Sequence, residues 1–453
     1  MPPSVKISGG LVMAADWRTV ALGELVEVFD GPHATPKKTS EGPIFLGISN
    51  LIEGRIDLTR SEHLSEQDLT TWTRRVTPKA GDLVFSYETR LGQAALIPEG
   101  LRCCLGRRMG LLRVRDRSKT DPQFLLYAYL GPLFQETIRQ KTIHGSTVDR
   151  IALIELPSFP IRVPSFTTQR YIAHILSTLD DKINLNRRMN QTLEAMVQAL
   201  FRSWFVDFDP VRAKAEGRHP EGMDAQTAAL FPSRLVKSVL GVIPEGWSIR
   251  MLRDITTKIG SGATPRGGSL VYADAGTAFI RSQNVFDDGF RWDGLVKIDD
   301  DAAAQLSGVS VREGDILFNI TGESVTRTCI VDPSALPARV SQHVAIIRPS
   351  LVSGPYLLLF LRERRTKDYL MGLDTGATRK AVTKGHLETT PVLCPTEEVL
   401  TRFTQLAAPL FRRCELNNSQ ARALGELRDA LLPKLLSGEI SVRDAKAQRA
   451  ATA

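Results

Sequence analysis

The second half of this chain repeats the first, and that duplication limits the folds that the chain can adopt. The segment VTPKAGDLVFS at Val76–Ser86 matches VSVREGDILFN at Val309–Asn319, where the residue numbers differ by 233. From Gly145 and Gly376 onward the difference is 231, and it stays constant for about 60 residues, a behaviour typical of a true repeat. Chance matching of common dipeptides is the alternative, but it does not predict a constant offset. We therefore expect two copies of one architecture.

Each copy begins with a strand-rich region and continues into a long helix. Short aliphatic runs lie between Gly and Pro breaks, as in GDLVFSY, AALIP and GLLRVR of the first copy and GDILFNI, TCIVD and HVAIIRP of the second. A shorter helix is predicted in both copies at a proline step, Asp121-Pro122 and Gly354-Pro355. The order predicts an α+β fold. Its expected segments are strand-rich domains at 16–160 and 241–392, long helices at 165–206 and 396–438, a linker at 207–240 and a tail at 439–453.

The two long helices carry apolar residues at near-heptad spacing, which is typical of helices that pair. The first helix is expected to begin after Ser165, a candidate N-cap. Asn186 and Asn417 lie on the apolar seams and would fix the register, because a slipped pairing leaves a buried amide unsatisfied. In the second helix Arg428 interrupts the seam, and Pro433 is expected to kink or end the helix near its last turn. The alternative is that each helix packs only on its neighbouring domain. We favour helix pairing through the seam residues Ile172, Leu176, Leu179, Ile183, Asn186, Leu193, Leu200 and Trp204 of the first helix and Phe403, Leu410, Asn417, Leu424 and Leu431 of the second.

Composition and motif content argue against several other classes of protein. Lys and Arg number 58 and Asp and Glu number 50, so the net charge is a mild +8. The five cysteines form no CxxC pair, so we expect neither a disulfide framework nor a metal site. Phosphate-loop, HExxH, GxSxG and methyl-donor motifs do not occur, so we expect no catalytic residues. The sequence has no long apolar run and no signal-like start, which favours a cytoplasmic protein with no membrane partner.

Three segments of the sequence resemble a known family. They are LDDKINLNRRMNQTLEAMVQALFRSWFVDFDPVRAKAEGR at Leu179–Arg218, GVIPEGW at Gly241–Trp247 and LRDALLPKLLSGEI at Leu427–Ile440. Together with the duplicated layout, these segments are similar to specificity (S) subunits of type I restriction–modification systems. The resemblance implies two tandem target-recognition domains separated by two long antiparallel coiled-coil helices, with a pseudo-twofold internal duplication. It also implies a bipartite, asymmetric DNA target, with one half read by each domain and the helices setting the distance between the halves.

The same resemblance implies how the work is divided among subunits. This chain would bind double-stranded DNA and would have neither catalysis nor a cofactor of its own. Two methyltransferase (M) subunits would use S-adenosylmethionine to methylate adenine, and restriction/translocase (R) subunits would use ATP and Mg for cleavage. An alternative from another class is a duplicated coiled-coil protein-interaction scaffold without DNA readout. A self-contained methyltransferase or nuclease is a weaker alternative, because the motifs of such enzymes are absent from the sequence.

Matched polar positions of the two copies are the candidate DNA contacts. Hydroxyl and cationic side chains in breaker-rich loops suit phosphate anchoring, whereas divergent polar residues on a shared framework suit base-edge reading. The competing interpretations are a solvated turn, an exposed strand edge or a structural turn. The candidates in the first copy are Thr35, Lys37, Lys38, Tyr87, Arg90, Arg107, Arg108, Ser146 and Thr147. The candidates in the second copy are Thr264, Arg266, Thr321, Glu323, Gln342, His343, Thr378, Arg379 and Lys380.

Overall fold

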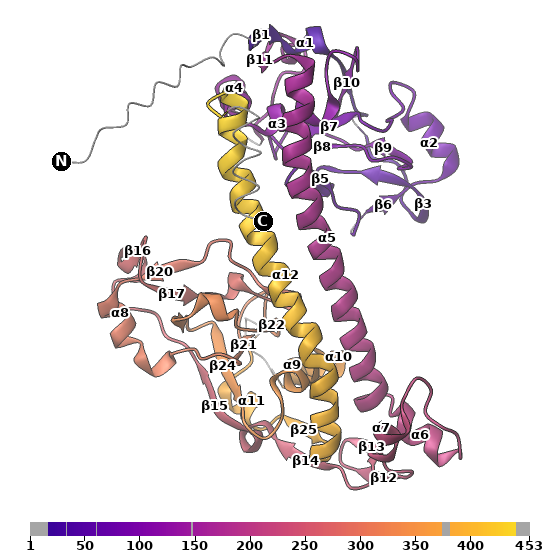
Figure 1. Cartoon of the computed structure of the whole chain (residues 1–453), viewed down its shortest axis with the longest axis vertical. Helices are drawn as coiled ribbons and strands as arrows, with labels where there is room; N and C mark the ends of the chain where they lie inside the picture. Colours follow the sequence, from indigo (N-terminus) through magenta and orange to yellow (C-terminus); the bar gives the residue numbers. More distant parts are fainter. Residues whose placement is uncertain (1–16, 33, 60, 146–147, 374–380, 441–453) are drawn as a thin grey trace, which may run out of the picture. The chain divides into compact units, whose positions relative to one another are not determined.

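The structure, a computed structural model, describes residues 17–32, 34–59, 61–145, 148–373 and 381–440. The chain forms two compact units. Unit 1 comprises Met1–Asn186 and Gln420–Ala453, and unit 2 comprises Arg187–Ser419. Both boundaries fall inside the long helices α5 (Phe166–Phe205) and α12 (Glu397–Ser437), so each unit holds one strand-rich domain and a part of each long helix. Figure 1 labels the elements of both units.

Unit 1 is built around a four-stranded antiparallel sheet in the order β2-β10-β7-β8. The central strands β7 and β10 are almost fully buried, which agrees with their continuous apolar runs. An ion pair ties these two strands together, since Arg113 lies 2.6 Å from Asp82, whose side chain is only 1% exposed. The strands of this sheet are β2 (Val26–Asp30), β7 (Leu83–Ser86), β8 (Ala94–Leu96) and β10 (Met109–Val114).

A second sheet of unit 1 has the order β6-β3-β9, in which β3 and β9 run parallel. Two short ladders, β1-β11 and β4-β5, complete the strands. Helix α3 begins at the Asp121-Pro122 step, where the Asp121 side chain accepts a hydrogen bond from the Phe124 amide and caps the helix. The bounds are β1 (Arg18–Ala21), β3 (Thr39–Leu46), β4 (Leu51–Ile52), β5 (Arg55–Ile56), β6 (Glu62–His63), β9 (Cys103–Leu105), β11 (Pro160–Val163), α1 (Leu22–Leu25), α2 (Glu66–Trp72), α3 (Pro122–Leu130), α4 (Pro132–Lys141), η1 (Ile48–Asn50) and η2 (Leu156–Ser158).

Unit 2 contains a four-stranded antiparallel sheet in the order β15-β24-β21-β22. Its central strands are tied like those of unit 1, because Arg348 donates two hydrogen bonds of 2.7 Å to the buried Asp315. A second sheet has the order β16-β20-β17-β23, with β17 and β23 parallel, and three ladders pair β12-β13, β14-β25 and β18-β19. The strands are β12 (Leu235–Ser238), β13 (Gly241–Pro244), β14 (Ser248–Met251), β15 (Thr256–Ser261), β16 (Tyr272–Ala273), β17 (Thr277–Ile280), β18 (Val285–Phe286), β19 (Gly289–Phe290), β20 (Val296–Ile298), β21 (Ile316–Asn319), β22 (Thr328–Ile330), β23 (Ala338–Val340), β24 (Val344–Pro349) and β25 (Pro391–Cys394). The helices are α6 (Asp209–Ala215), α7 (Ala225–Ala229), α8 (Asp300–Gln305), α9 (Gly354–Arg362), α10 (Arg364–Gly372), α11 (Lys384–Glu388), η3 (Leu252–Ile255), η4 (Gly268–Val271), η5 (Ser282–Asn284), η6 (Ser307–Val309) and η7 (Pro333–Ala335).

The core of each unit joins a sheet domain to the long helices. In unit 1 the main sheet, α3 and α4 pack with the first turns of α5 and the last turns of α12. In unit 2 an aromatic cluster fills the same role, since Phe205 of α5 packs on Phe403 of α12 and Tyr356 of α9, with ring centroids 5.0 and 4.9 Å apart. Burial of each such ring contributes about 1.5–3 kcal/mol. The long helices therefore pack on their neighbouring domains, as the alternative interpretation expected, and on each other as well.

Polar side chains also join α5 to α12 within each unit. In unit 1 Asn186 donates to Gln420 at 3.0 Å. In unit 2 Asn417 donates to Asn190 at 2.8 Å, and Asn190 donates to Asn418 at 2.6 Å. The two asparagines predicted to fix the register therefore each have a different partner. All predicted seam residues of both helices, each of them described, are buried or half-buried.

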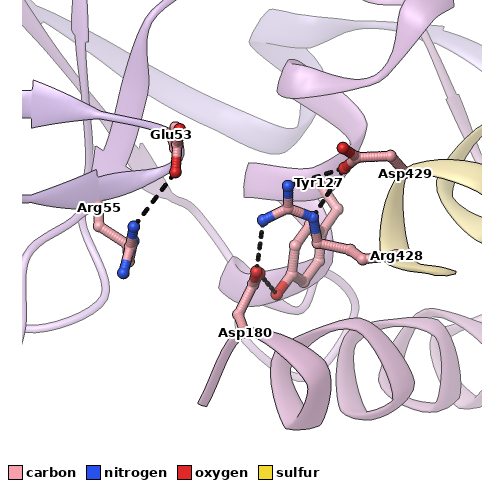
Figure 2. A network of polar contacts seen from close by, with 6 residues as sticks. All are labelled: Glu53, Arg55, Tyr127, Asp180, Arg428 and Asp429. Carbon is pink, nitrogen blue, oxygen red and sulfur yellow. Dashed lines mark hydrogen bonds and ion pairs between the residues drawn. The ribbon is translucent and has the colours of Figure 1, made fainter. Parts of the chain in front are cut away.

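The two features that interrupt the seam of α12 have a local explanation. In unit 1 Arg428 donates to Asp180 at 2.7 Å and to Asp429 at 2.7 Å, and the Tyr127 hydroxyl donates to Asp180 at 2.6 Å (Figure 2). The arginine is thus a polar link between α12, α5 and α3 within unit 1. Helix α12 continues past Pro433 and ends at Ser437, so the proline does not stop it at once. Its position in the last turns limits the loss to one backbone hydrogen bond near the helix end.

Candidate nucleic-acid interface

The candidate segments of unit 1 meet at one edge of the main sheet. Here β2 and β7 end and β10 begins, and we call this the loop edge. Gly31 donates to the Met109 carbonyl at 2.9 Å, Tyr87 donates to the Arg108 carbonyl at 3.2 Å, and Ile151 donates to the Tyr87 carbonyl at 2.9 Å. These three bonds bring together the loop after β2, the turn after β7, the Arg107-Arg108 turn and the segment that leads to Ile151.

Unit 2 has a loop edge held by corresponding bonds, where β15 and β21 end and β24 begins. Gly262 donates to the Val344 carbonyl at 2.9 Å, Ile320 donates to the His343 carbonyl at 3.0 Å, and Val382 donates to the Ile320 carbonyl at 2.9 Å. The candidate segments of the second copy therefore gather in the same way as those of the first.

A glycine lets the chain leave the sheet at both loop edges. A Cβ atom on Gly31 would lie 2.5 Å from the Met109 carbonyl oxygen, and one on Gly262 would overlap the Val340 carbonyl oxygen. Any other residue would push the following loop away from the sheet. The sequences DGPHATPKK and SGATPR therefore carry a glycine for close packing, and the candidate Thr35 and Thr264 follow it in exposed loops.

Most described candidates lie on the surface of these loops, which is where a macromolecular ligand could reach them. Tyr87 is buried, and Arg108 and Thr321 are half-buried. The exposed candidates are Thr35, Lys37, Lys38, Arg90, Arg107, Thr264, Arg266, Glu323, Gln342 and His343. Five further candidates lie outside the described residues and stay predictions, namely Ser146, Thr147, Thr378, Arg379 and Lys380.

Two turns at the loop edge of unit 1, the turn after β7 and the turn before β10, each hold one residue in an uncommon conformation. Thr89 and Arg108 have backbone φ angles of 68° and 71°, in the left-handed region that costs a non-glycine residue about 1–3 kcal/mol. Arg108 donates to the Thr89 hydroxyl at 3.2 Å, and its Nε lies 3.0 Å from a carboxylate oxygen of Glu88. Strain of this kind concentrates at binding sites, so the two turns are well suited to present Arg90 and Arg107, the neighbours of Thr89 and Arg108.

Tyr87 has a different position from the one expected of a base-reading group. Its ring is buried, and its hydroxyl donates to Asp30 at 3.0 Å. Burial, together with the nearby Asp30 carboxylate, raises the pKa of the phenol well above its usual value, so the hydroxyl remains a donor at neutral pH. The second oxygen of Asp30 accepts from Arg75 at 3.3 Å. Sequence reasoning missed Arg75, although the dibasic pair after α2 was a signal that could have pointed to it.

The loop edge of unit 2 carries its own polar pair, and a cationic cluster lies on β18 of the same unit. Thr321 Oγ1 and His343 Nδ1 are 2.7 Å apart and share a hydrogen bond. Arg327 and Arg291 lie over the ring of Phe286, at 4.6 and 5.3 Å from its centroid, as in cation–π contacts. Neither arginine was a candidate in the sequence. Arg327 becomes a neighbour of the ring only through the fold, whereas Arg291 directly follows the β18-β19 hairpin that holds Phe286.

Other kinds of site have little support among the described residues. No group of three or more His, Cys, Asp or Glu side chains in the described ranges could hold a metal ion. The five cysteines are free and buried, and burial raises the pKa of both Cys103 and Cys104 to about 12. No helix within the described part of the chain combines the length and the apolarity that a membrane span requires.

Comparisons with known proteins relate the whole chain to one kind of protein. A family model described as "Type I restriction modification DNA specificity domain" matches residues 14–195. The type I restriction enzyme HindI specificity subunit of Haemophilus influenzae is 28% identical over 65% of this chain and 72% of its own length. The type I restriction enzyme MjaIX specificity subunit of Methanocaldococcus jannaschii is 24% identical over 86% of this chain and 84% of its own length. The chain is similar to type I specificity subunits over most of its length.

A solved structure of a specificity subunit shares the fold. The type I restriction–modification S subunit from M. genitalium has a TM-score of 0.58 and 15% sequence identity, and the match covers 96% of this chain and 99% of that one. The family model covers the first strand-rich region and most of α5, whereas the match to the M. jannaschii specificity subunit extends over most of the chain. Both strand-rich regions are therefore parts of a specificity-subunit fold.

Proposed function

We propose that this chain is the DNA sequence-recognition subunit of a type I restriction–modification complex. The observation that carries the proposal is the loop edge, where three segments with described candidates gather in unit 1 and three corresponding segments gather in unit 2. Loops held on a rigid sheet are a common site of binding residues. The similarity to specificity subunits supports DNA as the ligand of these loops.

The two units are, in this proposal, two target-recognition domains that arose by internal duplication. The main sheets have corresponding strand orders, β2-β10-β7-β8 and β15-β24-β21-β22, and the buried Asp–Arg pairs occupy corresponding strands. Within the two units, the proposed target-recognition domains span 16–160 and 241–392, the bounds predicted from the sequence. Helices α5 and α12 form an antiparallel coiled coil between the domains, a pairing supported by the contacts within each unit.

The target of this proposed subunit is bipartite and asymmetric. The two loop edges share a backbone framework but differ in side chains, since Tyr87 and Arg108 of unit 1 correspond to Ile320 and His343 of unit 2. Groups that differ on a common framework would read different bases. Each half of the target would therefore have its own sequence, and the coiled coil would set the gap between them.

The chain acts without catalysis in this proposal, and chemistry is left to partners. Two methyltransferase subunits bind S-adenosylmethionine and methylate adenine, and restriction/translocase subunits use ATP and Mg for cleavage. The complex works in the cytoplasm on double-stranded DNA. The competing function is a coiled-coil scaffold that binds proteins alone.

The test is co-expression of the chain with the methyltransferase subunits of the same system. The complex is expected to retain duplex DNA, and sequencing of methylated bases in the host is expected to reveal one two-part motif that disappears when the gene is deleted. A complex that assembles but methylates no defined motif would favour the scaffold instead.

A further inference from the structure

A connected set of three side chains lies at the loop edge of unit 1. Tyr87 is only 5% exposed, and its hydroxyl donates to Asp30 Oδ1 at 3.0 Å. Asp30 Oδ2 accepts from Arg75 Nη1 at 3.3 Å, and the same nitrogen donates to the Gly31 carbonyl at 3.2 Å. The Arg75 side chain nevertheless remains 60% exposed. Asp30 and the Gly31 carbonyl therefore orient the Arg75 guanidinium, while the rest of it remains accessible to a ligand.

An open pocket of about 510 Å³ lies beside this guanidinium. Asp30 and Arg75 line it, together with Trp72 at the end of α2 and Pro32 and Ala34 of the loop after β2. Thr35, a candidate DNA contact, directly follows this lining in the sequence. Asp30 and Arg75 thus face this space, on the edge where the other candidates of unit 1 gather, whereas Tyr87 lies buried behind Asp30.

Unit 2 keeps the backbone frame but lacks all three side chains. Ser261 precedes the glycine that leaves the sheet, as Asp30 does in unit 1, and Ile320 takes the backbone bonds of Tyr87. In the repeat alignment Gly308 takes the place of Arg75. The set is therefore not part of the framework that the two units share. It lies instead at the loop edge, where the two units are proposed to read different sequences.

We propose that Arg75 reads the edge of a guanine in the half of the target bound by unit 1, with Asp30 and Tyr87 as positioning residues. This inference rests on the proposed function. The bidentate contact to guanine O6 and N7 requires a guanidinium held in one orientation, and a carboxylate bonded to its Nη1 supplies that orientation. A phosphate anchor gains nothing from this arrangement, because the carboxylate lowers the local positive charge that attracts phosphate.

The test uses the chain assembled with its methyltransferase subunits and maps the methylated motif. Arg75→Lys keeps the charge but removes the planar fork. It is expected to lower discrimination at one base of one half of the motif by about tenfold to a hundredfold, with the salt dependence of DNA binding unchanged. Tyr87→Phe keeps the buried ring and loses the bond to Asp30. It is expected to weaken the preference at that same base by a smaller factor, with an unchanged thermal unfolding midpoint.

Lys79→Ala is the matched control, because Lys79 is an exposed cation that precedes β7 at the opposite end of the strand. It is expected to leave every base of the motif unchanged. An unaltered motif in Arg75→Lys and Arg75→Ala would overturn the proposal. A uniform loss of affinity on all sequences in Arg75→Ala, with a shallower salt dependence, would also overturn it and would identify a phosphate contact. A wild-type complex without any motif would instead refute the proposed function.

Discussion

At the scale of single residues, buried amides join the two long helices in unit 2. Asn417 donates to Asn190, and Asn190 donates to the Cys414 carbonyl at 3.2 Å and to Asn418. Each amide completes the hydrogen bonding of another, so removal of one leaves a buried polar atom without its partner. The bonds thereby select which turn of α5 lies against which turn of α12 within this unit.

Asn417→Leu is expected to lower the free energy of unfolding by about 1–3 kcal/mol, because Asn190 loses its donor in a buried site. Replacement of both Asn190 and Asn417 by Leu is expected to recover most of that loss, since neither position then needs a hydrogen bond. Denaturant unfolding of the two variants measures the difference. Leu416→Ala is the control, because Leu416 is 56% exposed in the same helix. A double variant that is no more stable than the single one would contradict the argument.

Glu194 is expected to make the stability of unit 2 depend on pH. Burial raises the pKa of this α5 carboxyl from 4.5 to about 7, and Arg362, Asp288 and Arg291 also face it. The folded state holds the proton more tightly than the unfolded state, so this group makes unit 2 less stable as the pH rises from about 4.5 to about 7. Glu194→Gln is expected to remove this slope and to exceed the wild type in stability at about pH 8. The free energy of unfolding, measured in denaturant across this pH range, checks this prediction. Glu221→Gln, at an exposed position, is the control. Parallel curves for Glu194→Gln and the wild type would contradict the assignment.

At the scale of elements, α5 and α12 are joined differently in the two units. Besides the apolar contacts and the amides, unit 1 has the polar set of Tyr127, Asp180 and Arg428 (Figure 2), whereas unit 2 has the aromatic cluster around Phe205 and Phe403. When one member of a charged pair is removed, the other member is left half-buried without its hydrogen-bond partner. An aromatic link loses buried area and leaves a cavity. Substitutions at the two ends of a long helix are therefore expected to lower stability for different reasons, a lost polar partner in unit 1 and a lost apolar contact in unit 2.

Arg428→Met is expected to lower the free energy of unfolding by about 1–3 kcal/mol, because the half-buried Asp180 carboxylate loses its charged donor. A double variant with Asp180→Leu is expected to regain stability, as buried ion pairs replaced by apolar side chains often do. Hydrogen exchange of the last turns of α12 measures the local effect. Lys434→Ala, an exposed position of the same turns, is the control. Equal protection in Arg428→Met and the wild type would show that the ion pair contributes nothing measurable.

Helices and central strands could be predicted from the sequence because their signals are local. The heptad spacing predicted helices at 165–206 and 396–438, and α5 and α12 occupy Phe166–Phe205 and Glu397–Ser437. The parallel pairing of β3 with β9 and of β17 with β23 was not predicted. The alternation of apolar and polar residues along a strand does not determine which strand it pairs with, and the partners here are distant in sequence. The hydrogen-bond partners of Asn186 and Asn417 could not be predicted for the same reason, because a heptad pattern does not determine which turns of the two helices face each other.

At the scale of the whole molecule, the sequence located the loops of the candidate site but not the roles of their side chains. The repeat placed matched polar residues after matched strands, and the structure gathers those loops at one edge in each unit. Tyr87 was expected to face DNA, yet it is buried against Asp30. Arg75 was missed because it meets Asp30 across 45 positions of sequence. Local polarity predicts that a loop is exposed; which side chain orients another depends on tertiary contacts.

The proposed role of the long helices predicts how a change of length alters the target. Four residues inserted in α5 add about 6 Å of helix at about 1.5 Å per residue, which is close to two base-pair steps of duplex DNA. The gap between the two halves of the methylated motif is therefore expected to change, while the bases of each half stay the same. The same insertion beside Gly217, in the loop after α6, lengthens the chain without lengthening the helix and is the control. Methylation-site mapping that finds the original gap in the α5 variant would show that the helices do not set the spacing, because recognition would then depend on the two loop edges alone.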